Sequence, residues 1–427
     1  MKTRHLLLVI ATLSIWSLVG CAAHIDSRAA IEPIAEIAST NNGDTAEIRK
    51  AKESINAKPE LPAGFIQLAS AYMRRSREIG DHSLNKLAES AVEKALQLEP
   101  GNLSARKLQT SLLASSHNFV EARKEASALV AEIPDDSFAY GILVDANAEL
   151  GNYDEAVDAA QKMVDLKPNS SSYARVGHIR SLHGDHAGAV KMLTEAARTA
   201  DPQDKEAQSW CLVQLGKEYF KFGDLKKAED IVDESLQILP DYPMALTEKG
   251  RILTAKGDYD NAEAALNKAS GSVIQPAALI LLGDIRKAKG ELGTATEFYR
   301  LAEENVRQTS GDIHRFALLW ADHDERLDEA LEIAEKDFET NKDIYASDIL
   351  AWCLYKKGRF IEAKRSANEA SRLNTGDARI IYHAGMIEKA LGNTRQARKL
   401  LASALKISPE FDLLQAKTAK QALIELK

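Results

Sequence analysis

The sequence predicts an all-α solenoid of about ten helix-turn-helix repeats with a C-terminal capping helix, and three observations lead to this fold class. Around Phe222-Gly223-Asp224, apolar residues recur every three or four positions on both sides, which indicates two short amphipathic helices joined by a turn. An alanine recurs in the second helix at intervals of 33 to 35 residues, with one interval of 39. These alanines are Ala88, Ala122, Ala156, Ala189, Ala228, Ala262, Ala295, Ala330, Ala363 and Ala397. A glycine marks the turn in seven units, and a proline follows several of them.

Composition agrees with one large folded body and disfavours nucleic-acid binding. Of the 427 residues, 45% are hydrophobic and 28% are charged. Since each repeat packs only on its neighbours, an array of this length forms one solenoid. The net charge is −8, whereas sequence-independent binding of nucleic acid depends on a basic surface.

The N-terminal residues 1–20 read as a secretory signal peptide. Lys2 and Arg4 precede an apolar run from Leu6 to Leu18 that is too short for a standard transmembrane helix. The end of this segment, Leu18-Val19-Gly20-Cys21, resembles the lipobox of bacterial lipoproteins. The resemblance implies that Cys21 carries lipid and that the chain is anchored in the bacterial envelope, at the outer membrane and facing the periplasm. The alternatives are a plain signal peptide or an uncleaved anchor.

The remaining elements follow in order. Residues 21–60 form a tether that ends in a helix over Thr45–Ala57, which caps the first repeat. The solenoid covers residues 61–409, with a longer first hairpin at Arg74–Ser83 and a longer inter-repeat loop around Ala200–Glu206. The unit with Ala330 lacks both the turn glycine and the closing proline. Residues 410–427 form one amphipathic helix that covers the last repeat.

The repeat resembles the tetratricopeptide repeat (TPR) family. That family pattern is matched by Leu212, Leu215-Gly216, Tyr219, Ala228, Val232 and Pro240, and the resemblance extends over roughly Leu61–Pro409. It implies a superhelix whose first helices line a concave groove, with groove residues at fixed positions of each first helix.

In the register that this resemblance gives, seven aromatic or basic residues face the groove and contact a partner. They are Trp210, Lys217, Arg251, Tyr345, Trp352, Arg379 and Tyr382. Aromatic side chains and arginine are the usual anchors of protein interfaces. Lys217 and Arg251 are 34 residues apart and suit an anionic ligand such as a carboxylate-bearing peptide. The alternatives are that some of these residues belong to the inter-helix core, and that the cations pair with Glu248 and Asp284.

No sequence motif of an enzyme, cofactor site or metal site stands out. His178, His183 and His186 lie near one turn and are interpreted as solvated turn residues rather than as zinc ligands. Cys211 and Cys353 lie four repeats apart and are interpreted as buried free thiols.

The sequence therefore predicts a non-enzymatic, lipid-anchored envelope scaffold that binds a protein or peptide partner in its groove, without cofactor or nucleic acid. Assembly of an envelope, secretion or pilus complex is the expected setting. Two alternatives stay open: a module that binds cell wall or polysaccharide, and an envelope enzyme whose site is grafted on the repeats.

Overall fold

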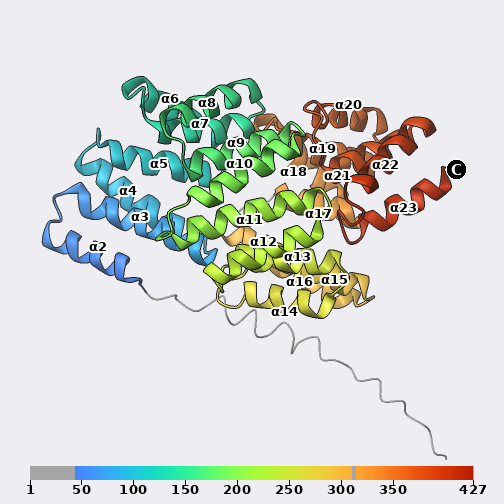
Figure 1. The fold of residues 1–427 in the computed structure, drawn as a ribbon, viewed down its shortest axis with the longest axis horizontal. Coiled ribbons are helices and arrows are strands. Elements are labelled where there is room, and N and C mark those ends of the chain that lie inside the picture. Colours follow the sequence, from blue (N-terminus) through green and yellow to red (C-terminus); the bar gives the residue numbers. More distant parts are fainter. Residues whose placement is uncertain (1–43, 310–313, 427) are drawn as a thin grey trace, which may run out of the picture.

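The computed structural model describes residues 44–309 and 314–426, and within these ranges it consists of 22 helices and no strands (Figure 1). The signal peptide, Cys21 and the tether up to residue 43 lie outside the described residues, as does Lys427. None of the described helices is long and apolar enough to cross a bilayer.

The helices form ten consecutive hairpins between one leading and one closing helix, as the sequence predicts. The leading helix is α2 (Ala46–Ala57) and the closing helix is α23 (Gln415–Glu425). The hairpins are α3 (Pro62–Ile79) with α4 (Leu84–Leu98), α5 (Leu103–Ser115) with α6 (Phe119–Glu132), α7 (Ser137–Glu149) with α8 (Tyr153–Leu166), α9 (Ser170–Leu182) with α10 (His186–Thr199), α11 (Lys205–Lys221) with α12 (Leu225–Ile238), α13 (Pro243–Ala255) with α14 (Tyr259–Ala269), α15 (Pro276–Ala288) with α16 (Leu292–Thr309), α17 (His314–His323) with α18 (Leu327–Thr340), α19 (Ile344–Lys356) with α20 (Phe360–Ala370), and α21 (Ala378–Ala390) with α22 (Thr394–Ile407).

Small residues let the two helices of a hairpin approach closely. Ala228 and Ala262 of the repeating alanine series are fully buried. On the facing first helix, a Cβ placed on Gly216 would lie 2.7 Å from Val232. The sequence period thus marks the closest contact between first and second helices.

Both predicted insertions lengthen helices as well as loops. The first hairpin begins with an 18-residue helix, α3, and the longer step before Ala228 extends α11 to 17 residues. The leading helix begins at Ala46 after a Thr45 cap. The C-terminal helix begins at Gln415, five residues later than expected, because Asp412 accepts hydrogen bonds from the backbone N–H groups of Leu414 and Gln415.

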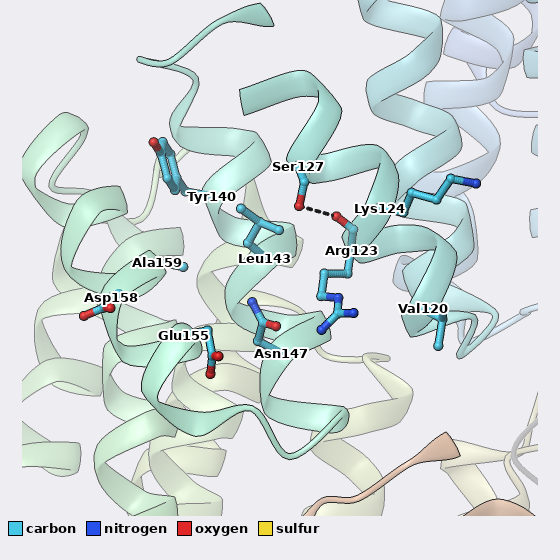
Figure 2. A pocket seen from close by; sticks show the side chains of 10 residues that line it. All are labelled: Val120, Arg123, Lys124, Ser127, Tyr140, Leu143, Asn147, Glu155, Asp158 and Ala159. Carbon is cyan, nitrogen blue, oxygen red and sulfur yellow. Dashed lines mark hydrogen bonds between the residues drawn. The ribbon is translucent and has the colours of Figure 1, made fainter. Parts of the chain in front are cut away.

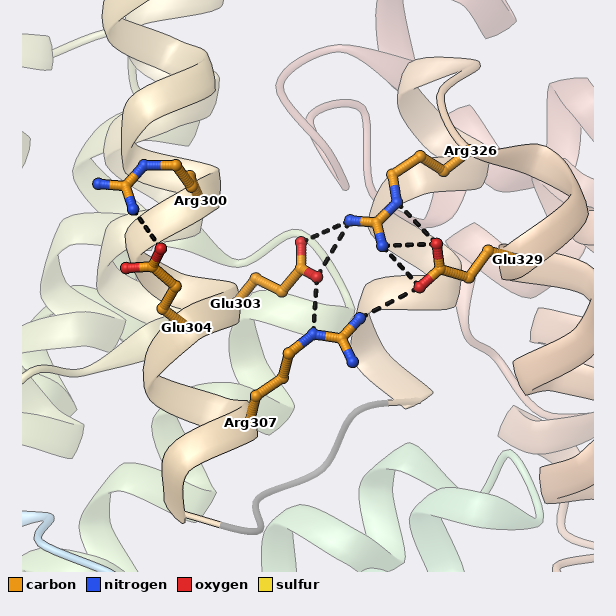
Figure 3. A network of polar contacts seen from close by, with 6 residues as sticks. All are labelled: Arg300, Glu303, Glu304, Arg307, Arg326 and Glu329. Carbon is orange, nitrogen blue, oxygen red and sulfur yellow. Dashed lines mark hydrogen bonds and ion pairs between the residues drawn. The ribbon is translucent and has the colours of Figure 1, made fainter.

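The repeat without a turn glycine forms its hairpin by other means. Asp324 and Arg326 adopt left-handed backbone conformations (φ 57° and 44°) between α17 and α18. Figure 3 shows the Arg326 guanidinium bound to Glu303 at 2.8 Å and to Glu329, which also accept hydrogen bonds from Arg307. The guanidinium also lies over the Trp320 ring, 3.9 Å from its centroid. Ion pairs and stacking thus hold a turn that glycine forms elsewhere.

The superhelix is wound so tightly that early turns touch loops near the C-terminal end. We call this set of contacts the seam. Three turn glycines lie so close to these loops that a Cβ would not fit. A Cβ placed on Gly151, Gly184 or Gly223 would lie 2.5 to 2.8 Å from the carbonyl oxygen of Lys342, Asn374 or Ile407, respectively. The Tyr153 hydroxyl accepts a hydrogen bond from the Ile344 N–H at 2.8 Å, across 191 residues.

Apolar packing continues across the seam. One hydrophobic cluster unites residues of α7, α8 and α9 with residues that begin or end α19, α20 and α21. Its buried members are Val144, Ala148, Tyr153, Ala156, Ala159, Ala160, Ile179, Leu182, Ile344, Ala370 and Ile380. Buried apolar area therefore stabilises the winding itself, in addition to each pair of neighbouring repeats.

Candidate functional site

The first helices of the hairpins form the inner part of the superhelix. Figure 1 places α9, α11, α19 and α21 toward the middle of the molecule and α6, α8, α14 and α20 at its edge. We call the side of the first helices that carries His178, Tyr345 and Arg379 the inner face.

Charged side chains from the middle and from the end of the array act on the same residue of the inner face. Burial raises the pKa of Tyr345 on α19, and among the charges that act on it are Arg379 of α21 and Glu218 of α11. His178 on α9 is accessible to water, yet the surrounding protein lowers the pKa of its imidazole, against an opposing effect of Asp145. A polar, partly desolvated surface is the result.

Arg379 is the inner-face cation with the most acidic surroundings. Burial lowers the pKa of its guanidinium, but Asp377, Asp348 and Asp322 outweigh this effect and raise the pKa overall. Its Nε lies 3.9 Å from the Asp348 carboxylate, too far for a hydrogen bond, and finds no acceptor among the described residues. About a third of the side chain, 34%, remains exposed. The Nε itself is buried, so an incoming group can reach only the other, exposed part of the Arg379 side chain.

Two of the seven predicted groove residues belong to the core. Trp352 is 1% exposed and Tyr382 is 0% exposed. The Trp352 indole stacks on His383 at a centroid distance of 4.1 Å and on Tyr355 at 4.7 Å, and its Nε1 donates to Asp322 at 2.8 Å. These two aromatic side chains hold α17, α19, α21 and the capping helix together, in agreement with the alternative that some of the seven are core residues.

The other five residues, two aromatic and three basic, are all half-buried. Trp210 and Tyr345 pack against hydrophobic clusters. Arg251 donates to the buried Glu248 carboxylate at 3.3 Å, which is the pairing given as the alternative, while 41% of its side chain stays exposed. Lys217 is half-buried on α11. The structure thus places two aromatic residues of the set in the core and leaves the other five partly accessible.

No pattern in the sequence indicates the polar group around Asp322. Its carboxylate accepts hydrogen bonds from Trp352 and, at 3.1 Å, from Gln415 of the capping helix, whose side-chain carbonyl accepts from the Tyr382 hydroxyl at 2.7 Å. Burial raises the pKa of Asp322 to about 7, with His383 acting to lower it and Asp412 to raise it. Only a prediction of which repeats the capping helix touches could have revealed this group.

We expect Asp322→Asn to stabilise the protein at pH 7 and above. Because burial raises the folded-state pKa above the ordinary value of 3.8, ionisation of Asp322 costs stability as the pH rises from about 4 to about 7. Asparagine keeps an oxygen for Trp352 and Gln415 but does not ionise. Urea unfolding at pH 5 and at pH 8 measures the effect: the variant should lose less stability than the wild type between them, and equal losses would contradict the assignment.

The three clustered histidines have separate surroundings. His183 contacts the backbone carbonyl of Ile179 at 2.8 Å, and His186 contacts the Glu218 carboxylate at 3.0 Å while it stacks on Phe222. No group of three metal-ligating side chains converges in the described ranges. Cys211 and Cys353 are buried free thiols, as predicted, and burial raises the pKa of each to about 12.

Comparison with known proteins agrees with the repeat structure. The tetratricopeptide repeat model matches residues 111–171 and 213–275, and a second model of the same description matches residues 378–411. Photosystem I assembly protein Ycf3 of Acaryochloris marina is 33% identical over 116 residues, 26% of this chain and 68% of that protein. Cellulose synthase operon protein C of Pseudomonas fluorescens is 25% identical over 203 residues, 45% of this chain and only 16% of that protein.

Two solved structures are also similar in fold. The Cut9–Hcn1 hetero-tetramer of the APC/C aligns with 94% of this chain and 64% of that chain (TM-score 0.46, 17% identity). The type IV pilus biogenesis factor PilW aligns with 47% of this chain and 92% of that chain (TM-score 0.40, 19% identity). From the repeat matches and the ten hairpins we conclude that the chain belongs to the tetratricopeptide repeat family.

Proposed function

We propose that the protein is a lipid-anchored scaffold of the bacterial envelope, whose inner face binds a segment of a protein partner during assembly of a larger complex. The anchor rests on the resemblance of Leu18-Val19-Gly20-Cys21 to a lipobox. The assembly role rests on the repeat architecture and on the similarity to one relative, a photosystem I assembly protein. No catalytic step is part of this proposal.

Arg379 is the observation that carries the binding role. A positively charged side chain that is 34% exposed suits a carboxylate or a backbone carbonyl of a bound peptide. Lys217 of α11 and Arg251 of α13, which the repeat register assigns to groove positions, add positive charge to this proposed site. Such cations fix the orientation of an anionic ligand and raise its association rate, and salt weakens both effects.

A charge reversal on the inner face tests this role. We expect Arg379→Glu to weaken binding of the purified full chain to an array of random linear peptides by at least about tenfold, that is about 1.4 kcal/mol. The matched control is Lys226→Glu on α12, because the lysine side chain is 77% exposed and forms an ion pair with Asp230 of the same helix. Equal binding by both variants, with melting temperatures as in the wild type, would remove Arg379 from the site.

The anchor is tested by Cys21→Ser. Serine keeps the size of the side chain but does not provide the thiol that accepts the diacylglyceryl group. We expect the variant to lose labelling by a radioactive fatty acid and to accumulate with its N-terminal segment attached. Labelling equal to that of the wild type would show that the segment is not a lipoprotein signal.

Binding of a polysaccharide is the alternative function, and it is tested separately because one relative is named after a cellulose synthase operon. Two of the aromatic residues that would stack on a sugar, Trp352 and Tyr382, are buried. Retention of the purified chain by isolated glycan, unaffected by Arg379→Glu, would favour that alternative over peptide binding.

A further inference from the structure

A cavity of about 750 Å³ lies on the outer side of the molecule, between the second helices of two successive repeats. We call it the α6/α8 furrow. Figure 2 shows α6 on one side, α8 on the other and α7 between them as the floor. Val120 and Arg123 lie on the α6 wall, and Glu155 and Asp158 on the α8 wall. The floor presents Tyr140, Leu143 and Asn147.

The same furrow occurs a second time in the array, between α20 and α22. This α20/α22 furrow has a cavity of about 980 Å³ lined by Lys364, Glu388 and neighbouring residues. Lys364 follows Arg123 by 241 residues, and Glu388 follows Asn147 by the same number. The two furrows can therefore be compared position by position.

In the α20/α22 furrow the chain neutralises its own charge. The Lys364 ammonium lies 3.0 Å from the Glu388 carboxylate, which also accepts a hydrogen bond from Asn393. A similar bridge occurs farther back, where Lys249 of α13 binds Glu229 of α12 at 2.9 Å. In these repeats a charge on the second helix is paired with an opposite charge on the next first helix.

The α6/α8 furrow has the cation but not its counter-ion. The position of Glu388 is occupied by Asn147, whose side-chain oxygen is bound to Asn152 at 3.3 Å. In residues 44–309 and 314–426 the Arg123 guanidinium forms no ion pair, and neither do the Glu155 and Asp158 carboxylates of the opposite wall. Single unpaired surface charges are ordinary, but here they flank an apolar floor, and Lys364, the equivalent of Arg123, is paired in the other furrow.

From this difference we propose that the α6/α8 furrow docks an amphipathic helix of a second protein. The partner helix supplies a carboxylate to Arg123 and lysine or arginine side chains to Glu155 and Asp158. Its apolar side covers Tyr140, Leu143 and the 42%-exposed Val120. Arginine and tyrosine at the centre of such a patch are typical anchors of interfaces.

A helix fits this furrow better than an extended segment does. The walls and floor are helices whose backbone groups are bonded within each helix, so the furrow offers no free edge to a strand. A helix satisfies its own backbone, and its side-chain ridges pack between those of neighbouring helices. The charge pattern then sets its direction, with acidic residues toward α6 and basic residues toward α8.

The experiment uses a photo-crosslinking amino acid at Ser127, on the α6 wall, in the full chain expressed in its own cells. Asn368 is the equivalent position in the α20/α22 furrow, 241 residues later, and provides the matched control. We expect irradiation to join Ser127, but not Asn368, to one protein. Mass spectrometry should map the adduct to an amphipathic helical segment with acidic and basic residues on opposite flanks.

Two substitutions separate docking from chance proximity. Asn147→Glu recreates the internal pair that Glu388 forms with Lys364, so it should abolish the adduct without loss of thermal stability. Arg123→Gln removes the positive charge but keeps a long polar side chain, and it should reduce the yield of the adduct at least several-fold. This variant provides the test if Asn147→Glu folds poorly. No adduct at Ser127, an adduct insensitive to both substitutions, an adduct with a second copy of this chain, or a mapped segment without acidic residues would each overturn the proposal.

Discussion

Replacing Asp348 with alanine should lower the free energy of unfolding by about 2–5 kcal/mol, because the change leaves buried polar groups without their acceptor. Asp348 is 1% exposed, and its two carboxylate oxygens contact His383 Nδ1 at 2.9 and 3.0 Å. His383 is fully buried, and its other nitrogen has no hydrogen-bond partner among the described residues. The charge of Arg379 lies 3.9 Å from the same carboxylate.

Asp348→Asn is the control for this prediction. Asparagine keeps the volume and one acceptor oxygen for His383 but removes the negative charge beside Arg379. We expect a smaller loss than with alanine, measured by urea unfolding at constant pH. A loss below about 1 kcal/mol with alanine would mean that water or a neighbouring group replaces the carboxylate, and that the network around Trp352 does not depend on it.

Gly151→Ala should destabilise the protein more than Gly257→Ala, although the two glycines have nearly the same backbone conformation. Both adopt left-handed φ values, +76° and +78°. An added Cβ on Gly151 would lie 2.5 Å from the Lys342 carbonyl oxygen. An added Cβ on Gly257 would have no atom within 4 Å apart from those of the residue itself and its chain neighbours. Each alanine costs about 1–2 kcal/mol for its left-handed conformation. In Gly151→Ala, the added methyl group also overcrowds the seam, which should lower the free energy of unfolding by about 1–3 kcal/mol more.

Hydrogen exchange locates that additional cost. The Ile344 N–H donates to the Tyr153 hydroxyl across the seam, so its exchange should accelerate in Gly151→Ala and stay unchanged in Gly257→Ala. Small-angle scattering should show a more open particle for the first variant only. Equal destabilisation of both variants, with equal protection of Ile344, would mean that the seam does not stabilise the superhelix.

Local patterns in the sequence were sufficient for the repeat architecture. The alanine period predicted the second helix of each hairpin, where the structure shows that only a small side chain fits, and the glycines predicted the turns, where residues such as Gly151 adopt left-handed conformations. The leading helix followed from Thr45 and the apolar spacing after it. Each of these features depends on residues fewer than about 40 positions apart, within one or two repeats, where helix periodicity applies.

The orientation of the predicted groove residues could be derived only in part. Successive residues of a helix point about 100° apart, so residues at family groove positions can be covered when large side chains follow on the next helix. Tyr382 and His383 cover Trp352 in this way, and Gln415 of the capping helix binds Tyr382. Arg379 stays partly exposed because it lies near the start of α21, one turn before those aromatic residues.

The sequence by itself determined the hairpins, their number and the helices at both ends, because each repeat is specified by contacts with its neighbours. Only the tertiary structure decided the winding, because small rotations accumulate from repeat to repeat and no local motif encodes their sum. That winding brings Gly184 against Asn374 and Tyr153 against Ile344, and it places Glu218 near Tyr345 on the inner face. The difference between the α6/α8 and α20/α22 furrows also became visible only there, because one pairs its cation within the chain and the other does not.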